Sequence, residues 1–323
     1  MATPSGQAGP ESLVYPIADG EEWILFDGIA TDPDEPGPHD ALYLVRPDGT
    51  GLHRLVYQMD GSEIRGTWSP DGSQVAYIQT RWPLDGGPGA GIYVVNADGT
   101  DPQRVYECAA WCHTTDYLDW ADDGAIYVGI DSNAPDHDSP PLTFEIWRID
   151  PATGDARAVL TREDGEMSVE QPRVSPDGTQ LVYTRGRIDD ETAIFIADMA
   201  GGAEQQLTDW ELNASYPDWS VNGLISFNTN DLRIRPDDPH WVYTVRPDGS
   251  GLRRIETHDP DSPDVEVQAG HARWTPDGTA MTFSLIPASR TAYLALMNAD
   301  GSDQRLVPGP VWGTFSELRP VTD

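Results

Sequence analysis

The sequence contains no lysine. All 20 of its basic residues are arginine, and they stand against 54 aspartates and glutamates in 323 residues. The resulting formal net charge of −34 argues against a nucleic-acid partner, because binding to phosphate depends on a basic surface. Three explanations of this composition stay open: adaptation to high salt, a GC-rich genome, or a surface that collects cations and cationic ligands.

Cysteine is also scarce, because Cys108 and Cys112 in the segment ECAAWC are the only two. Residues this close in a loop can be bridged if their Cβ atoms face each other. A paired set with no spare thiol suits an oxidising compartment. We therefore expect a disulfide between Cys108 and Cys112.

Long apolar runs are missing as well, since no stretch approaches the roughly 18–20 apolar residues of a membrane span. The first twelve residues, MATPSGQAGPES, are small and polar, unlike the apolar centre of a secretory signal. Such a start is typical of the flexible linker that remains after a leader or lipid anchor has been removed. We expect residues 1–12 to be a flexible linker and the protein to be exported, whether periplasmic, cell-surface, lipid-anchored or secreted.

What the sequence has in abundance is the turn Pro-Asp-Gly or a near relative, in two alternating contexts. One context follows a tryptophan or valine, as in WSPDG, WADDG, VSPDG, WSVNG and WTPDG, and the other follows a short apolar run, as in LYLVRPDGT. Proline presets φ for a type I turn, aspartate bonds back to the backbone, and glycine takes the positive φ that closes a tight hairpin. Two hairpins in each repeat predict four strands.

The second turn recurs about every 50 residues, which is the spacing of a propeller blade. Its glycines are Gly49, Gly99, Gly154, Gly201, Gly249 and Gly301. Segments such as QVAYIQ at 74–79 alternate as half-buried strands do. We predict an all-β, six-bladed β-propeller with four antiparallel strands per blade, in a single domain over 13–323. A terminal strand should close the ring, and either 13–26 or 311–320 could supply it.

The pattern of WSPDG, two strands, Asp-Gly and Arg-x-Leu resembles the WD40-like (PD40) repeats of the TolB family, whose C-terminal domain is a six-bladed propeller. The resemblance covers roughly residues 13–307 and implies the fold specifically. For function it leaves several options, because related propellers serve as partner-binding modules, as propeller domains of peptidases and as lyases. The sequence departs from TolB in having no room for the separate N-terminal domain of that protein, so we do not expect a role in the Tol-Pal system from the resemblance.

In a propeller, the loops between strands two and three and the loops that enter the next blade surround one mouth of the channel. Here those loops are long and acidic, as at 27–40, 131–141 and 230–240, and we expect function on this channel face. Asp131, Asp136 and Asp138 offer the hard oxygen ligands that calcium prefers, although aspartate and proline are also what a solvated turn uses.

A second group of candidates lies just before the first turns, where side chains should point toward the channel. Three positions before the Trp or Val of each turn stand Arg65, Tyr117, Gln171, Tyr216 and His271. His113, Gln171 and His271 could converge on a metal. Some oligogalacturonate lyases with a similar fold hold manganese through histidines and a glutamine, and this resemblance extends to residue types only. Arg65 or Arg173 could then pair with a carboxylate of the substrate.

The tryptophans fall into two classes. Four of them occupy one position of the repeat and should pack between blades: Trp68, Trp120, Trp219 and Trp274. Four others fall in or beside the channel-face loops, where no repeat position requires them: Trp82, Trp111, Trp210 and Trp241. Exposed indoles stack on sugars or anchor partner side chains, but they could also cap the ends of blades.

These observations favour an exported, non-enzymatic binding module, monomeric, that presents the channel face to a protein, peptide or glycan. The alternative is a metal-dependent lyase or hydrolase acting on an acidic saccharide or small molecule at the channel mouth. The only cofactor to which the sequence points is a divalent cation, calcium or manganese. Nucleophilic hydrolysis is disfavoured, because the sequence has no GxSxG elbow.

Overall fold

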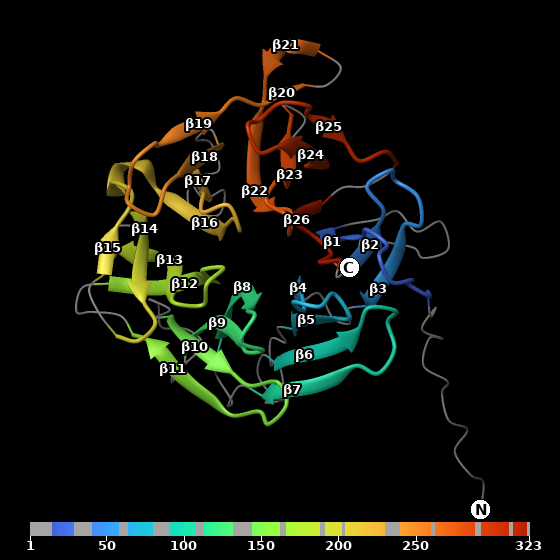
Figure 1. Cartoon of the computed structure of the whole chain (residues 1–323), viewed down its shortest axis with the longest axis vertical. Helices are drawn as coiled ribbons and strands as arrows, with labels where there is room; N and C mark the ends of the chain where they lie inside the picture. The colour runs from blue at the N-terminus through green and yellow to red at the C-terminus, as the bar shows by residue number, and fades with distance from the viewer. Residues whose placement is uncertain are drawn as a thin grey trace, which may run out of the picture.

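The structure, a computed structural model, is a ring of six four-stranded sheets around a central axis (Figure 1). It describes residues 15–28, 41–57, 64–79, 91–107, 113–131, 144–161, 166–187, 191–201, 204–229, 240–259, 262–287, 292–309 and 313–321. Neighbouring strands within each sheet are antiparallel, as in the pairing of β5 (Gln74–Gln79) with β6 (Gly91–Asn96). The prediction of a six-bladed propeller with four antiparallel strands per blade is confirmed.

The first three blades take their strands, from the axis outward, as follows. The first blade contains β26 (Gly313–Leu318), β1 (Ile24–Gly28), β2 (Ala41–Val45) and β3 (His53–Tyr57). The second contains β4 (Ile64–Trp68), β5, β6 and β7 (Gln103–Glu107). The third contains β8 (His113–Trp120), β9 (Ile126–Asp131), β10 (Glu145–Ile149) and β11 (Ala156–Leu160).

The other three blades repeat this order. The fourth contains β12 (Glu166–Val174), β13 (Gln180–Arg187), β14 (Thr192–Asp198) and β15 (Glu204–Gln206). The fifth contains β16 (Ala214–Trp219), β17 (Ile225–Thr229), β18 (Trp241–Val245) and β19 (Arg253–Ile255). The sixth contains β22 (Gln268–Trp274), β23 (Ala280–Ile286), β24 (Tyr293–Asn298) and β25 (Arg305–Leu306).

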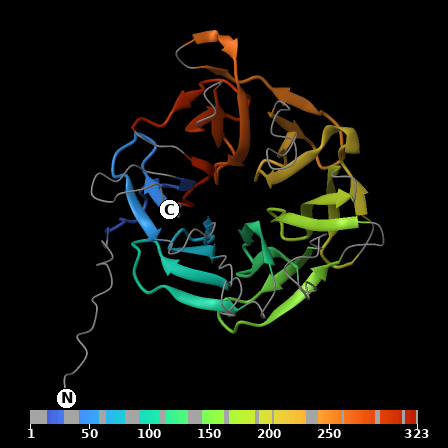
Figure 2. The same cartoon turned by 180° about the vertical axis from the view of Figure 1, so that it is seen from behind.

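Two short elements lie between blades. The 3-10 helix η1 (Trp210–Leu212) precedes β16, and a separate ribbon pairs β20 (His258–Asp259) with β21 (Ser262–Glu266). The ribbon projects outward from the ring, which is seen from behind in Figure 2. Among the described residues, no helix is long and apolar enough to cross a membrane.

The C-terminal strand closes the ring. This is one of the two options that the sequence had left open. Strand β26 pairs with β1, and Leu25 lies opposite Glu317 in the register. Arg319, which follows β26, is buried, and its guanidinium donates to the carbonyl oxygens of Ala18, Glu21 and Gly72 at 2.8–3.1 Å. The segment 311–320 therefore provides the innermost strand, while the end of 13–26 forms the strand beside it.

The first turns hold their shape through the hydrogen bonds of the aspartate. Asp277 accepts hydrogen bonds from the hydroxyl of Thr275 at 2.6 Å and from the backbone N–H of Thr279 at 3.0 Å. In the corresponding turn of the second blade, Gly72 has φ of +66°. A Cβ at Gly72 would lie 2.2 Å from the carbonyl oxygen of Pro320, so glycine is required there both for φ and for the passage of the C-terminal segment.

Apolar side chains pack between neighbouring blades, as expected for a ring whose blades bury each other's faces. Each hydrophobic cluster of the described residues draws on two adjacent blades. Trp68 and Trp274 are buried in two of these clusters, while Trp120 and Trp219 are half-buried against two others. The predicted packing of this class of tryptophans between blades is confirmed.

The innermost strands carry bulges that set the direction of the side chains along the axis. The register shifts between Glu170 and Arg173 in β12, and comparable shifts interrupt β8, β16 and β22. Within three of the bulges a non-glycine residue has a left-handed backbone: Gln171 at φ +56°, Tyr216 at +54° and His271 at +53°. Such conformations cost about 1–3 kcal/mol each, and bulges re-aim side chains beside functional sites.

Candidate functional site

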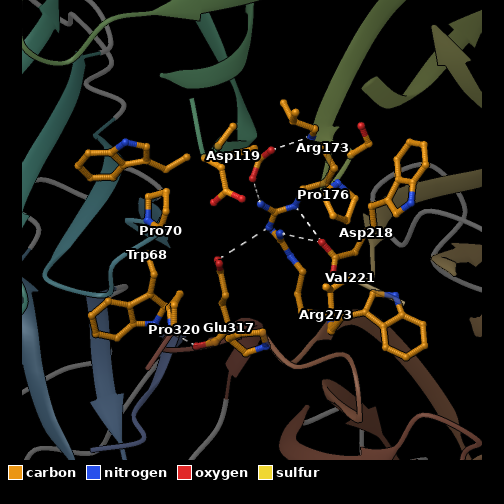
Figure 3. A pocket seen from close by; sticks show the side chains of 18 of the residues that line it. Trp68, Pro70, Asp119, Arg173, Pro176, Asp218, Val221, Arg273, Glu317 and Pro320 are labelled. Atoms are coloured by element: carbon orange, nitrogen blue, oxygen red, sulfur yellow. Dashed lines mark hydrogen bonds and ion pairs between the residues drawn. The ribbon is translucent and has the colours of Figure 1, made fainter. Parts of the chain in front are cut away.

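Six side chains from six blades meet on the axis at one level. Each stands immediately before the Trp, Val or Leu that ends its innermost strand: Thr67, Asp119, Arg173, Asp218, Arg273 and Glu317. We call this set the charged layer. Figure 3 shows Asp119, Arg173, Asp218, Arg273 and Glu317 pointing toward one another. Glu317 is half-buried and the other five are buried.

Arg173 is the hub of the charged layer. Its guanidinium forms an ion pair with Asp119, lies 3.0 Å from Asp218 through Nε and 3.8 Å from Glu317 through Nη2. Arg273 reaches Asp218 at 3.5 Å. Three carboxylates therefore face two guanidiniums, which leaves one negative charge uncompensated when all the groups are ionised.

The two aspartates of the charged layer also join neighbouring blades. Oδ2 of Asp119 accepts the backbone N–H of Val174 in the next blade at 2.8 Å, and Oδ2 of Asp218 accepts that of Trp274 at 2.7 Å. Glu317 likewise receives a backbone hydrogen bond from Trp68 in the next blade, and it accepts the hydroxyl of Thr67 at 2.8 Å. All three carboxylates of the charged layer therefore link neighbouring blades.

Burial shifts the ionisation of the charged layer. Burial raises the pKa of Asp218 to about 7 against the attraction of Arg173, and it raises the pKa of Glu317 to about 7 with the neighbouring carboxylate of Asp119 adding to the shift. Although burial alone would lower the pKa of Arg173, its carboxylate partners hold that pKa above the ordinary arginine value. Near neutral pH, protons thus offset part of the excess negative charge.

A layer of aromatic rings lies directly below the charged layer. Tyr117, Tyr216, His271 and Phe315 come from four different blades, and we call them the aromatic layer. Ring centroids are 5.5 Å apart for Tyr117 and Tyr216, 5.3 Å for Tyr216 and Phe315, and 4.0 Å for His271 and Phe315. Tyr117 and Tyr216 are 2% and 3% exposed, so the rings fill the channel at this level.

Above the charged layer, a cavity of about 340 Å³ opens on the face of the first turns. Its base is the charged layer, and its wall is formed by residues of the turns: Trp68, Pro70, Trp120, Pro176, Trp219, Val221, Trp274, Pro276 and Pro320. Exposed Asp122 and Asp123 stand at the lip. We call this cavity the funnel, and it is blind because the aromatic layer lies beneath its base.

The funnel lies on the face opposite to the predicted channel face, because the first turns and the long acidic loops are at opposite ends of the innermost strands. Large parts of those loops, including 29–40, 132–143 and 230–239, lie outside the described residues. Function on the predicted channel face therefore stays a prediction. The sequence did hold a signal for the funnel, since the position before the Trp, Val or Leu that ends each innermost strand reads Thr, Asp, Arg, Asp, Arg and Glu around the ring.

Four of the predicted channel residues occupy the two layers. Arg173 belongs to the charged layer, and Tyr117, Tyr216 and His271 belong to the aromatic layer. Arg65 lies 4.4 Å above the ring of Phe315 and donates to Asp27 at 2.6 Å. Arg65 and Arg173 are therefore both already paired with carboxylates of this chain.

The predicted manganese ligands are only partly described. The side-chain oxygen of Gln171 accepts the backbone N–H of Tyr216 and the hydroxyl of Thr184, both at 2.8 Å. His113 begins β8, but its side chain lies outside the described residues. Within the described part of the chain, no group of three His, Cys, Asp or Glu side chains is placed to hold a metal. Manganese binding stays a prediction.

Several other predicted residues fall outside the described ranges, namely Trp82, Trp111, Cys108, Cys112, Asp136 and Asp138. Asp131 ends β9, and its side chain is not described. The disulfide and the calcium site therefore stay predictions. Trp210 in η1 lies 3.7 Å below the guanidinium of Arg187, and Trp241 at the start of β18 lies 4.1 Å from that of Arg254.

Comparison with known proteins gives one sequence relative and many similar structures. No family profile matches the chain. An uncharacterized peptidase of Bacillus subtilis, YuxL, is 32% identical over 216 residues, which are 63% of this chain and 29% of that protein. The match thus spans less than a third of the length of this relative, and it leaves most of that protein without a counterpart here.

Solved structures match over nearly the whole chain. TolB from Acinetobacter baumannii has a TM-score of 0.68 at 15% identity, over 94% of this chain and 67% of that one. A putative TolB from Agrobacterium tumefaciens has a TM-score of 0.62 at 17% identity, over 93% and 99%. An oligogalacturonate lyase in complex with manganese has a TM-score of 0.52 at 14% identity, over 90% and 74%. Prolyl endopeptidases are also among the similar structures. At these identities the likeness concerns the fold alone.

Proposed function

This chain has a TolB-like six-bladed β-propeller fold, and from that premise we propose that it is an exported, non-enzymatic binding module. Its partner is a protein, peptide or glycan, and the binding surface is the mouth of the channel on the face of the first turns. The observation that carries this proposal is the blind funnel, whose base of fixed charges and wall of prolines and indoles combine the features of a ligand pocket.

The geometry of the base supports binding more than turnover. Asp119 and Asp218 each hold a backbone N–H of the next blade and an arginine. A role in proton transfer or nucleophilic attack would interrupt these bonds between blades, whereas a bound ligand leaves them intact. Because the groups are held before the ligand arrives, little conformational entropy is lost on binding.

The volume of the funnel supports a partner that inserts one side chain or a short peptide segment. A cavity of about 340 Å³ lies near the lower limit of pockets that enclose small ligands. Around it, the turns of several blades offer a wider rim for the remainder of a partner. Proteins and peptides carry protruding side chains that can enter a cavity of this size.

The test is selection of peptides from a random displayed library on the intact protein, followed by affinity measurements on two variants. Val221 is 54% exposed and lines the funnel, so Val221→Trp should obstruct it. Leu252 is 48% exposed and is absent from the funnel wall, so Leu252→Trp is the matched control. We expect the selected peptides to lose at least about ten-fold in affinity for V221W alone. Equal binding to both variants would contradict the proposal.

One observation favours the alternative, a lyase or hydrolase acting on an acidic saccharide or small molecule. Glu317 is partly accessible from the funnel and has a pKa of about 7, as a general base requires. Under this alternative, the protein supplied with Mn²⁺ or Ca²⁺ should cleave oligouronates, and Glu317→Gln should abolish the cleavage. If the protein cleaves no member of an oligouronate panel with either metal, the alternative is wrong.

A further inference from the structure

The charges of the funnel base do not balance, and this imbalance indicates what kind of ligand it accepts. The charged layer holds three carboxylates and two guanidiniums. At the lip, Asp122 adds one more carboxylate, whereas that of Asp123 is paired with Arg148 at 3.0 Å. Both arginines already touch aspartates, so an incoming anion would meet an excess of negative charge, whereas an incoming cation would neutralise it.

Glu317 is the acid of the base that a ligand can reach. Its side chain is 20% exposed, against 12% and 11% for those of Asp119 and Asp218. It is held by the hydroxyl of Thr67 at 2.8 Å, by the backbone N–H of Trp68 and by Arg173 at the longer distance of 3.8 Å. Its carboxylate therefore keeps hydrogen-bonding capacity for a donor that enters from the funnel.

The wall of the funnel suits the stem of a long side chain. The prolines and indoles around it, with Val221, are largely apolar, so they can cover methylene groups while a charged head reaches the base. Indole faces also attract cations. Because the aromatic layer closes the floor, such a side chain must enter and leave from the face of the first turns.

We propose that the funnel binds a cationic side chain, an arginine or lysine of a partner protein or peptide, whose charged head pairs with Glu317 and displaces a proton from the charged layer. This inference rests on the proposed binding function and names the chemistry that the partner must offer. The proton leaves a carboxyl group of the layer for solvent as the carboxylate becomes the acceptor of the ligand N–H groups, so charge is conserved at the base.

The charged and titratable groups that surround Glu317 are consistent with the exchange of a proton for a cationic side chain. Arg173, Asp119, Asp218, Arg273 and Tyr117 face it from the other innermost strands. On the strands packed beside β26, Asp27 and Arg65 are paired with each other, and His271 lies in the aromatic layer. Burial and the nearby carboxylates hold the pKa values of Glu317 and Asp218 near 7, so protons are available for release at neutral pH.

The experiment uses the full chain and two small probes, N-acetylarginine amide and its neutral isostere N-acetylcitrulline amide. Calorimetry near neutral pH, in two buffers with different ionisation enthalpies, gives both the affinity and the number of protons released. We expect the arginine probe to bind at least about ten-fold more tightly than the citrulline probe, which corresponds to about 1.4 kcal/mol. We also expect release of a fraction of a proton, up to about one, per bound probe.

Two variants assign the effect to the funnel. Glu317→Gln should weaken binding of the arginine probe by about ten-fold and reduce the proton release. Glu107→Gln, at an exposed carboxylate paired with Arg104, should change neither quantity. Because Gln resembles the protonated acid in shape, E317Q should fold, and unfolding curves verify this. Equal binding of the arginine and citrulline probes, or an unchanged proton release in E317Q, overturns the inference.

The peptides selected on the intact protein separate this inference from the function on which it rests. If they bind in the funnel but carry no excess of arginine or lysine, the cationic ligand is wrong and the binding function stands. If no selected peptide distinguishes V221W from L252W, the binding function itself fails. If Ca²⁺ or Mn²⁺ alone binds with proton release and excludes the arginine probe, the funnel is a metal site and the inference is overturned.

Discussion

Arg173 stands out among the residues because one buried guanidinium serves three carboxylates from three other blades. Removing it leaves Asp119 and Glu317 without a nearby compensating charge in a buried environment. We expect Arg173→Met to lower the free energy of unfolding by about 3–5 kcal/mol, the cost of breaking a buried ion pair from one side. Urea unfolding near neutral pH measures this.

Arg104→Met is the matched control for Arg173. Its ion pair with Glu107 has side chains that are 41% and 47% exposed, and such surface pairs contribute about 0–1 kcal/mol. A loss of stability in the Arg104 variant as large as that in the Arg173 variant would show that the charged layer has no special role in stability.

Glu317 and Asp218 give the stability of the protein a particular dependence on pH. Burial raises both pKa values to about 7, above the values of about 4 in unfolded chains. The stability that their protonated forms contribute is fully present below the unfolded pKa and is lost as the pH rises through about 7. We expect the free energy of unfolding to fall between about pH 5 and pH 8.

Glu317→Gln should make that fall smaller by an amount on the order of 1 kcal/mol, because glutamine stays neutral across the range. Asp218 remains in the variant, so the slope should decrease without disappearing. The measurement is a series of urea unfolding curves at several pH values. A variant whose slope matches that of the unsubstituted protein would contradict the raised pKa of Glu317.

At the scale of elements, the first turns respond to pH in the opposite direction. The hydroxyl of Thr275 and the backbone N–H and hydroxyl of Thr279 lower the pKa of Asp277. Its contribution to stability is therefore present above the unfolded pKa of about 3.9 and is lost as the pH falls through the lower folded value. Asp277→Ala should lower Tm by a few degrees near neutral pH, and the difference should shrink in acid.

Thermal unfolding monitored by circular dichroism at several pH values checks this prediction. Asp264→Ala in the exposed strand β21 is the control and should leave Tm almost unchanged. An effect of Asp277→Ala that stays constant down to acidic pH would mean that its hydrogen bonds do not depend on the ionised carboxylate.

The elements themselves were largely predictable from the sequence. The strand predicted at 74–79 coincides with β5 (Gln74–Gln79), and the turn glycines have the positive φ that the turn chemistry requires. The choice of closing strand was not predictable, because both terminal segments alternate in the same way. Pairing of Leu25 with Glu317 joins opposite ends of the chain, and a local pattern holds no information on such a contact.

The candidate site was less predictable for a related reason. Sequence comparison of the repeats emphasises what the blades share, whereas the charged layer consists of what differs between them. Asp119, Arg173 and Asp218 each look like an ordinary polar residue of a strand until the ring brings them together. Of the residues predicted three positions before the Trp or Val of each turn, Tyr117, Tyr216 and His271 lie at the axis in the aromatic layer, one level deeper than the base of the funnel.

At the scale of the whole molecule, closure of the ring also involves contacts made outside the strands. Arg319 is 7% exposed and donates to three backbone carbonyl groups in the first blade and in the first turn of the second. Arg319→Leu leaves these carbonyl oxygens without their donor, so we expect a loss of at least about 2 kcal/mol in the free energy of unfolding.

Limited proteolysis should also release the C-terminal segment of the Arg319 variant earlier than that of the unsubstituted protein. Arg305→Leu is the control, because Arg305 pairs with Asp303 on the surface, where the side chains are 53% and 66% exposed. Unchanged protease resistance together with unchanged stability in the Arg319 variant would show that Arg319 is not needed to hold β26 in the ring.

The position of Glu317 within β26 couples ligand recognition to closure of the ring. The first blade lacks its inner strand without residues 313–318, and the acid that we expect to recognise the ligand lies in that same strand. A molecule that loses this segment would therefore lose ring closure and ligand capture together.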